Sequence, residues 1–344
     1  MTISELTERE LVARIQRHLP PTPPWMPVGI GDDAAVVEPE RNRLEVLSVD
    51  ALVEGVHFDR RFTPPEAIGH RALAVNLSDL AAMGAAPRLA LLSFALPASL
   101  TCADFDAMVG GLAALAARYR LHVAGGNLTR TPGPLMVDIT VVGTVKRRQV
   151  LTRAGASPGD EMYVSGTIGA AAAGLLALKD AAAGPPLAAV PSRLEACVRR
   201  FLYPDPRIKL GLLLGRNRAA SACVDLSDGL ADGVRQIAYA SSVGVEIEEA
   251  ALPVEAATIE MFASRGKPAA SAAILDQAIG AGDDYELLFT VHPQRRARLR
   301  AAHRHSDVPF TRIGVCTTSR DLIIQRRGAD AAARPLPAGY SHFR

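Results

Sequence analysis

The sequence predicts an α/β (or α+β) protein built from two domains. Its 344 residues are enough for two domains that each bury their own core. Runs rich in β-branched residues alternate with helix-like runs along the whole chain, which is typical of these classes. The pattern restarts at the turn-forming stretch Ala156–Asp160, which contains Pro and Gly. We therefore expect domains at residues 1–149 and 150–344.

The N-terminal half is expected to begin with an amphipathic helix, because charged residues interrupt the apolar positions of residues 1–19. The same charges exclude the uncharged central region of a signal peptide. The helix Pro65–Gly84 has proline at its start and glycine at its end. The other elements predicted here are strands at Leu44–Asp50 and Arg88–Leu96, a helix at Ala103–Tyr119, a strand that ends at Gly125-Gly126, and a strand at Leu135–Lys146.

The C-terminal half repeats the alternation. The predicted strands are Met162–Ser165, Ser221–Asp225, Val245–Glu248 and Tyr285–Val291. The predicted helices are Ala170–Lys179, Arg193–Phe201, Arg207–Arg216 and Gly229–Ala240. The Gly/Pro-rich stretch Ala181–Pro191 is expected to be a surface loop.

Composition excludes several classes of protein. The net charge of +2, from 38 basic and 36 acidic residues, lacks the excess of positive charge that is typical of proteins that bind nucleic acid or anionic membranes. No apolar run reaches the roughly 20 residues that span a bilayer. The four cysteines are widely spaced and form no CxxC or Cys/His metal pattern, which favours buried thiols in a reducing compartment. We expect a soluble cytoplasmic protein.

Familiar nucleotide-binding motifs are absent. There is no GxxxxGK[ST] loop and no HRD or DFG set of a protein kinase. Gly29–Ala34 matches a loose GxGxxA, but a proline-containing segment precedes it and β-branched residues follow it. Because the strand–turn–helix context is missing, a dinucleotide site is rejected.

Aspartates that stand beside glycines, at strand ends or at helix starts are the main candidates for metal binding and catalysis. They are Asp32, Asp33, Asp50, Asp79, Asp225, Asp228, Asp283 and Asp284. Several end an apolar strand or open a helix, where α/β folds place ligand-binding groups. Carboxylates in such number suit Mg²⁺, and their mutual repulsion without cations would be destabilising. If these side chains converge, the sequence therefore predicts bound metal.

Each aspartate also has a structural alternative. Asp32 and Asp33 are also typical turn residues, and Asp228 is a candidate N-cap for a helix that begins at Gly229. Asp79 lies within an apolar helix, where a buried carboxylate without a partner is costly. Taken one by one, the aspartates are equally consistent with caps and with metal ligands.

Other candidates depend equally on context. Gly125-Gly126 either lets the backbone approach a nucleotide phosphate or forms a plain turn. Arg153 is either a phosphate clamp or a surface arginine. His57 is either a binding residue or a loop histidine, and the loop is favoured without further context.

Seven strings together resemble the thiamine-monophosphate kinase family. They are GIGDDAAVV (29–37), SVDALVEGVHF (48–58), ALAVNLSDLAAMGAAP (72–87), GGNLTR (125–130), LTRAGASPGD (151–160), DLSDGL (225–230) and GDDYELLF (282–289), and GYSHF (339–343) resembles the family's terminus. This family is grouped with aminoimidazole ribonucleotide synthetase, selenophosphate synthetase and a hydrogenase-maturation protein, all of which use ATP.

The resemblance implies a fold, an activity and a set of site residues. It implies an N-terminal domain that dimerises into a shared β-barrel, a C-terminal α/β domain, and transfer of phosphate from ATP to thiamine monophosphate with Mg²⁺. The implied metal-binding residues are Asp33, Ser48, Val49 (through its backbone), Asp50, Asp79, Asn127, Asp225 and Asp228. Gly126, Asn127, Arg153 and Ser227 would contact ATP, and His57 and Asp283 the acceptor. Asp50, Asp79 and Arg153 would be catalytic, while Asp32 and Asp284 are supporting neighbours.

Four positions depart from the family pattern. Asn127 stands where a metal-binding aspartate is usual, and Val49 replaces a threonine. Asp283 replaces a glutamate, and Pro337 stands where an aromatic residue that covers the thiamine ring is expected. The implied reaction is direct in-line transfer without a general base. The rival functions are a sister ATP-dependent enzyme, such as aminoimidazole ribonucleotide synthetase, and a non-catalytic nucleotide-binding relative.

Overall fold

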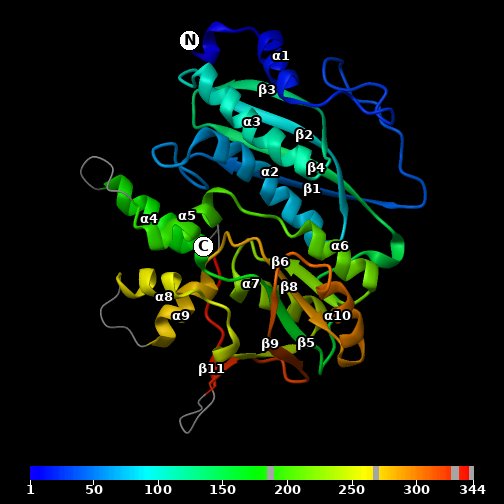
Figure 1. Ribbon diagram of the computed structural model, residues 1–344, viewed down its shortest axis with the longest axis vertical. Helices are drawn as coiled ribbons and strands as arrows, with labels where there is room; N and C mark the ends of the chain where they lie inside the picture. Colours follow the sequence, from blue (N-terminus) through cyan, green and yellow to red (C-terminus); the bar gives the residue numbers. More distant parts are fainter. Residues whose placement is uncertain (184–189, 266–270, 327–332, 341–344) are drawn as a thin grey trace. The chain divides into compact units, whose positions relative to one another are not determined.

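The computed structural model describes residues 1–183, 190–265, 271–326 and 333–340 (Figure 1). Contacts divide the chain into two compact units. Unit 1 comprises Met1–Leu80 and Ala86–Arg147, and unit 2 comprises Ala81–Ala85 and Arg148–Arg344. No helix in the described ranges is long and apolar enough to cross a membrane.

Unit 1 is a mixed four-stranded sheet with helices. The strands are β1 (Leu44–Val53), β2 (Ala86–Pro97), β3 (His122–Thr131) and β4 (Met136–Val145), in the order β1-β4-β2-β3. The helices are α1 (Glu8–His18), α2 (Pro65–Ala82) and α3 (Cys102–Arg118). β4 pairs antiparallel with β1 and β2, and β2 pairs parallel with β3. Within the described part of this single chain the sheet is open and does not close into a barrel.

The two faces of this sheet differ in what covers them. Leu92 and Phe94 on β2 point to the face that α2 and α3 cover, where Phe94 meets Phe105 of α3 with ring centroids 6.0 Å apart. Leu47 and Val49 on β1 point to the opposite face, where their side chains are 67% and 58% exposed. Part of this face therefore carries exposed apolar side chains, while Met26 packs on Leu89 elsewhere on it.

Glycines allow α2 and α3 to pack closely. A Cβ on Gly69 would lie 1.8 Å from the carbonyl oxygen of Met108, and one on Gly111 would lie 2.0 Å from that of Glu66. Neither helix backbone can accommodate such an atom, so the approach of the two helices depends on these residues. The pair in turn fixes α2 against the sheet.

Unit 2 is built on a seven-stranded mixed sheet with the order β11-β10-β7-β9-β5-β8-β6. Its strands are β5 (Glu161–Ser165), β6 (Ala222–Asp225), β7 (Gly244–Glu248), β8 (Leu287–Val291), β9 (Phe310–Thr317), β10 (Leu322–Gln325) and β11 (Arg334–Pro335). Its helices are α4 (Ala170–Ala183), α5 (Glu195–Leu202), α6 (Ile208–Asn217), α7 (Leu230–Ser241), α8 (Ala256–Ala263), α9 (Ser271–Gly280) and α10 (Arg296–His303). All five residues of β8 are buried, and four of them, all but Thr290, are apolar.

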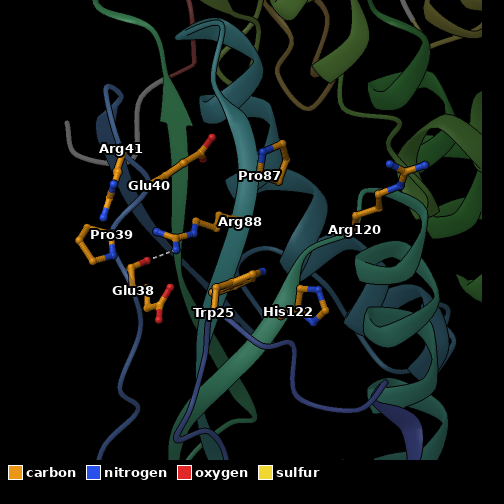
Figure 2. Close-up of a pocket in the computed structure, with 9 residues that line it drawn as sticks. All are labelled: Trp25, Glu38, Pro39, Glu40, Arg41, Pro87, Arg88, Arg120 and His122. Carbon is orange, nitrogen blue, oxygen red and sulfur yellow. Dashed lines mark hydrogen bonds between the residues drawn. The ribbon is translucent and has the colours of Figure 1, made fainter.

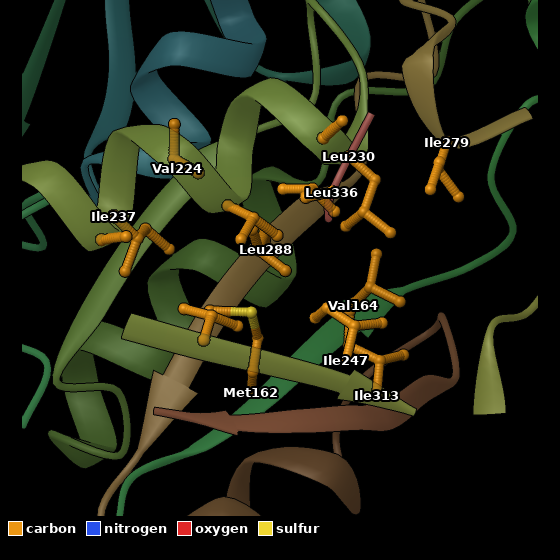
Figure 3. Close-up of a cluster of buried hydrophobic side chains, with 14 of the residues drawn as sticks. Met162, Val164, Val224, Leu230, Ile237, Ile247, Ile279, Leu288, Ile313 and Leu336 are labelled. Atoms are coloured by element: carbon orange, nitrogen blue, oxygen red, sulfur yellow. The ribbon is translucent and has the colours of Figure 1, made fainter. Parts of the chain in front are cut away.

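The core of unit 2 joins the sheet to α7. Met162 and Val164 of β5 and Leu288 of β8 pack with Leu230 and Ile237 of α7 in one buried cluster (Figure 3). Removing a side chain from such a core typically costs about 2–5 kcal/mol of unfolding free energy. This core fixes β6 and α7, and with them the loop that connects the two.

Some elements differ from the sequence-based expectation. β3 does not end at Gly125-Gly126 but continues to Thr131, because both glycines pair with β2. The helices α8, α9 and α10 and the strands β9, β10 and β11 were not predicted. Of the expected loop Ala181–Pro191, residues 181–183 belong to α4 and residues 184–189 lie outside the described residues, as do Ser341–Phe343 of the terminal string.

Candidate functional site

In unit 1, Ser48, Asp50 and Asp79 are held near one another by β1 and α2. Ser48 and Asp50 are alternate residues of β1 and so lie on the same face of the sheet. The Ser48 hydroxyl donates a hydrogen bond to the Asp79 carboxylate on α2. The structure therefore brings the hydroxyl and the α2 carboxylate into direct contact, with Asp50 one step further along the same strand face.

Asn76 was not assigned a role by the sequence, yet it belongs to this arrangement. Its side chain is completely buried, and its Nδ2 donates to the carbonyl oxygens of Ala72 at 3.0 Å and Asp50 at 3.4 Å. Its Oδ1 has no hydrogen-bond partner among the described residues. An asparagine inside an apolar helix was the available signal, because a buried amide is costly unless it is bonded.

Asp32, Asp33 and Val49 are exposed to solvent. The Asp33 backbone N–H donates to Oδ1 of Asp32 at 2.8 Å, and Gly31 before them has φ +115°. This local bond fits the turn alternative for Asp32 and leaves the Asp33 side chain at the surface. The Val49 side chain points to the open sheet face, so only its backbone can contribute on the side of Ser48.

His57 lies in a tight turn directly after β1. Its Nδ1 accepts from the backbone N–H of Val53 at 3.1 Å, and its own backbone N–H donates to the Val53 carbonyl at 2.9 Å. A nitrogen that accepts cannot carry the proton, so this geometry places the proton of the neutral ring on Nε2. Half-buried His57 is thus a loop residue fixed through Nδ1, with the proton of the neutral ring on Nε2.

Gly126 and Asn127 lie on the edge strand β3. A Cβ on Gly126 would lie 1.8 Å from the carbonyl oxygen of Leu92, so close pairing with β2 requires glycine here. Asn127 pairs with Ser93, which alternates with buried residues and so belongs to the open face of the sheet. The structure does not bring Asn127 together with Ser48 and Asp79, which lie on the helix-covered side.

In unit 2, two predicted strings form one paired substructure. The Leu226 N–H donates to the Glu286 carbonyl at 2.8 Å, the Tyr285 N–H to Leu226 at 3.0 Å, and the Asp283 N–H to Ser227 at 2.7 Å. Backbone bonds therefore join residues 225–229 to residues 282–286, far away in sequence. The candidate residues Asp225, Ser227, Asp228 and Asp283 all belong to this pair of loops.

Burial differs among these residues. Asp225 ends β6 and is buried, whereas Ser227, Asp228 and Asp283 are half-buried. The N-cap of α7 is Gly229, with φ +88° and no side-chain cap bond, so the alternative of Asp228 as the N-cap is wrong. Asp283 has φ +72°, and its Oδ1 accepts from the Tyr285 hydroxyl at 3.2 Å.

Arg153 lies in an exposed segment beside β6. The neighbouring Thr152 carbonyl accepts from the Cys223 N–H at 2.8 Å, and the Arg153 carbonyl accepts from the Ser241 hydroxyl at 3.3 Å. These bonds fix the backbone of the segment to β6 and to the end of α7. The Arg153 side chain is exposed, as a residue that binds an anionic ligand from solvent must be.

Tyr340 near the C-terminus is a second residue to which the sequence gave no role. Its N–H donates to the Asp228 carbonyl at 3.4 Å, and its side chain is 49% exposed. Pro337 is held differently, because its carbonyl accepts from Arg235. Tyr340, three residues after the proline, is thus tied through its backbone to the Asp225–Gly229 loop. The terminal string GYSHF contains this tyrosine and was the signal for it.

No group of three or more His, Cys, Asp or Glu side chains that could hold a metal occurs among the described residues. The donors near one another in unit 1 are the hydroxyl of Ser48 and the carboxylates of Asp50 and Asp79, and those in unit 2 are Asp225 and Asp228. All are hard oxygen donors. Mg²⁺ usually takes only one or two carboxylates and completes its shell with water and substrate phosphates, so this donor set fits that ion.

A hollow of about 580 Å³ in unit 1 contains none of the predicted site residues (Figure 2). The guanidinium carbon of Arg88 lies 4.5 Å from the centre of the Trp25 ring, and Arg88 also donates to the Glu38 carbonyl. His122 meets Trp25 edge-on at 5.4 Å, and burial lowers the pKa of His122. These side chains hold one another in place. We assign the hollow no part in the candidate site.

Comparison with known proteins covers both units. Residues 31–145 match the family described as AIR synthase related protein, N-terminal domain, and residues 157–327 match its C-terminal domain. Thiamine-monophosphate kinase of Bacillus subtilis is 35% identical over 92% of this chain and 94% of its own.

Two solved structures are also similar. Thiamine-monophosphate kinase from Stenotrophomonas maltophilia K279a has a TM-score of 0.80 and 37% identity, covering 93% of this chain and 96% of its own. A structure described as "AaThiL complexed with AMPPCP and TMP" has a TM-score of 0.72 and 30% identity, covering 100% and 99%. The two-domain α/β architecture is thus that of the AIR synthase related proteins, and the chain belongs to the thiamine-monophosphate kinase family.

Proposed function

We propose that this chain transfers the γ-phosphoryl group of ATP to the phosphate of thiamine monophosphate, giving thiamine diphosphate and ADP. The observation that carries this proposal is full-length likeness to a structure described as holding AMPPCP and TMP. AMPPCP is an analogue of ATP. The relative in that structure therefore binds a nucleoside triphosphate analogue together with a second ligand. Likeness over both units argues that the same pair is the natural one here.

The chemistry requires no general base in this chain. An oxygen of the acceptor phosphate attacks the γ-phosphorus, and the bond from that phosphorus to the β–γ bridging oxygen breaks, releasing ADP. The attacking oxygen is already anionic at neutral pH, so no proton has to be removed. Positioning and charge neutralisation are the main contributions of the protein. The exposed guanidinium of Arg153 supplies positive charge for the phosphates.

Mg²⁺ would be held in unit 1 by Ser48, Asp50 and Asp79, and in unit 2 by Asp225 and Asp228. When bound, it neutralises charge on the phosphates of ATP. The exposed Asp33, the Val49 backbone and Asn127 are further proposed ligands. Ser227, Gly126 and Asn127 are proposed contacts of the nucleotide. These assignments rest on the donor chemistry and on the family pattern.

The acceptor would contact His57, Asp283 and Tyr340. The Nε2 side of His57 can donate to a phosphate, and the Asp283 carboxylate can accept from an amino group. The exposed Tyr340 ring, tied through its backbone to Asp228, offers an apolar surface for an aromatic ligand. We therefore assign the ring-covering role to Tyr340 and not to position 337.

We propose further that the chain forms a homodimer through the open face of the unit 1 sheet. Leu47, Val49 and Leu91 expose large apolar side chains on that face. Contiguous exposed apolar area of this kind usually marks an interface. The family pattern implies that the two four-stranded sheets of a dimer close into one barrel, with this face turned inward. A two-fold dimer would use the same patch on both copies.

A cytoplasmic location is also proposed. All four cysteines are free and buried, as is usual in a reducing compartment.

The test is to incubate the chain with ATP, Mg²⁺ and a panel of acceptors and to separate the products by chromatography. Thiamine monophosphate should give the diphosphate, while free thiamine, which lacks the acceptor phosphate, should not be phosphorylated appreciably. Turnover of a purine intermediate instead would favour a sister enzyme. Tight ATP binding without turnover of any acceptor would favour a non-catalytic relative.

A further inference from the structure

Two non-glycine residues with positive φ, in the left-handed region, flank a buried aspartate in unit 2. Asp283 has φ +72° and Tyr285 has φ +50°, while Asp284 between them is 3% exposed. Residues other than glycine rarely adopt this conformation and keep it only where their surroundings hold them. The question is which contacts hold this turn.

The Asp284 carboxylate binds the beginning of α4. Its Oδ2 accepts from the Gly169 N–H at 2.6 Å and its Oδ1 from the Ala171 N–H at 3.3 Å. Gly169 directly precedes α4 and Ala171 belongs to its first turn, where backbone N–H groups have no partner within the helix. In addition, Nη2 of Arg200 donates to the Asp284 carbonyl at 3.3 Å. The carboxylate thus fixes the turn to a helix that packs in the body of unit 2.

Glu286 anchors the other side of the turn. Its completely buried carboxylate accepts from Arg207 Nε at 2.7 Å and from the Ser165 hydroxyl at 2.5 Å, and it pairs with Arg200 at 2.7 Å. This cluster fixes the start of β8. It does not by itself hold Asp283, which lies before Asp284 in the chain.

The turn presents Asp283 to the Asp225–Gly229 loop. The Asp283 N–H donates to the Ser227 carbonyl at 2.7 Å, and its carboxylate accepts from the Tyr285 hydroxyl. A Cβ on Gly282 would lie 2.4 Å from the Ser227 carbonyl oxygen, so the two backbones approach closely. The direction of the Asp283 side chain therefore depends on the position of the 283–285 turn relative to the Asp225–Gly229 loop.

We propose that Asp284 is a positioning residue for the acceptor substrate. By binding the first turn of α4, its carboxylate holds Asp283 in the left-handed conformation and at the correct distance from Ser227. This inference rests on the proposed function, in which Asp283 contacts the acceptor. Asp284 itself is buried, and its carboxylate faces the backbone at the start of α4.

The test uses the full chain at pH 8, where the carboxylate of Asp284 is ionised, and compares it with Asp284→Asn, which keeps the size of the side chain. An amide can accept through its oxygen, but its NH₂ group cannot accept from a second backbone N–H. We expect the KM for thiamine monophosphate to rise on the order of tenfold, below the hundredfold loss that a 1 Å misplacement can cause. The KM for ATP should change by less than about twofold, because the phosphate-binding groups stay in place.

Glu161→Gln is the matched control. Glu161 is another buried carboxylate of unit 2, bound by Arg296 and Arg312, but it lies at the opposite end of β5 from Ser165. This variant should lower thermal stability without changing the acceptor KM. A loss of stability alone is therefore distinguished from a loss of positioning.

A double substitution tests whether Asp284 acts through Asp283. In an Asp283→Ala background, adding Asp284→Asn should leave the acceptor KM unchanged, because no carboxylate remains to be positioned. Additive effects, equal changes in both KM values, or an unchanged acceptor KM in the single variant would overturn the proposal. If Asp284→Asn does not fold, Arg200→Lys, which weakens the bond to the Asp284 carbonyl, should raise the same KM to a smaller extent. Failure of the unsubstituted chain to phosphorylate thiamine monophosphate would instead refute the proposed function.

Discussion

At the scale of single residues, the contact between Ser48 and Asp79 is the most informative. It joins a strand hydroxyl to a helix carboxylate on the face where Asp50 also lies. We expect Asp50→Asn and Asp79→Asn each to lower turnover on the order of a hundredfold or more, because each removes charge from the proposed Mg²⁺ ligands. Turnover with ATP and thiamine monophosphate, together with a thermal melt, measures activity and folding separately.

Asp106→Asn is the control for this pair. Asp106 is a carboxylate of the same unit that forms an ion pair with Arg14 and is not a proposed ligand. Its loss should change turnover by less than about twofold. Near-normal turnover of Asp79→Asn at saturating Mg²⁺ would show that Asp79 only accepts from Ser48 as a structural partner.

Asn127 stands where the family pattern has a metal-binding aspartate, so its amide bears on the Mg²⁺ requirement. It is exposed on the open face of the sheet, away from Ser48 and Asp79, and an amide oxygen is a hard donor without charge. We expect an active enzyme whose Mg²⁺ requirement falls several-fold in Asn127→Asp, without loss of turnover, since a carboxylate binds the ion more strongly. A Mg²⁺ titration of both proteins measures this. Equal midpoints would indicate that Asn127 serves only the strand, and loss of ATP binding would indicate that its amide contacts phosphate.

At the scale of elements, regular local patterns were predicted well and long-range pairing was not. β1 and α2 were found because strand-forming residues and helix-end signals are local in sequence. β3 was cut short because glycine usually signals a turn, whereas Gly126 serves close pairing with Leu92, which only the partner strand reveals. β9 was missed because its stability depends on β5 and β7, which lie far away in sequence.

The exposed apolar side chains on the open face of the unit 1 sheet predict the oligomeric state. Leu47→Lys together with Val49→Asp should shift the chain from dimer to monomer, because charged groups would be buried at the proposed interface. Sedimentation velocity at several protein concentrations measures the shift. Tyr239→Asp, which changes a 91% exposed side chain of unit 2, is the control and should leave the dimer intact. A chain that is monomeric before any substitution would refute the proposed dimer.

At the scale of the whole molecule, the candidate residues could be listed from the sequence but not their pairing. The bonds between residues 225–229 and 282–286 join segments that no local pattern connects. The roles of Asp284 and Glu286 were hidden for the same reason, because their partners Gly169, Arg200 and Arg207 lie far from them in the chain.

Buried Asp284 gives the stability of the chain a dependence on pH. Burial raises its pKa to about 7, against the opposing effects of Arg200 and of the Gly169 and Ala171 N–H groups, while nearby Glu286 raises it further. Between about pH 4 and 7 the folded chain therefore holds a proton that the unfolded chain has lost. The free energy of unfolding contributed by this group should fall as pH rises through this range, on the order of a few kcal/mol in total.

Denaturant unfolding between pH 5 and 8 measures this dependence. Asp284→Asn should flatten the curve, because an amide does not titrate. Glu161 titrates in the opposite sense: its bonds to Arg296 lower its pKa, so its contribution is lost only as pH falls below about 4.5. An equally steep curve in Asp284→Asn would show that another group causes the slope.

The close approach of the two loops has a consequence for protein engineering. A Cβ on Gly229 would lie 2.3 Å from the Ala281 carbonyl oxygen, just as one on Gly282 would strike Ser227. Substituting either glycine would therefore displace the backbone of the partner loop. A library meant to change acceptor choice should randomise both segments jointly and keep these glycines fixed, and loops grafted from a relative should be transplanted as a pair.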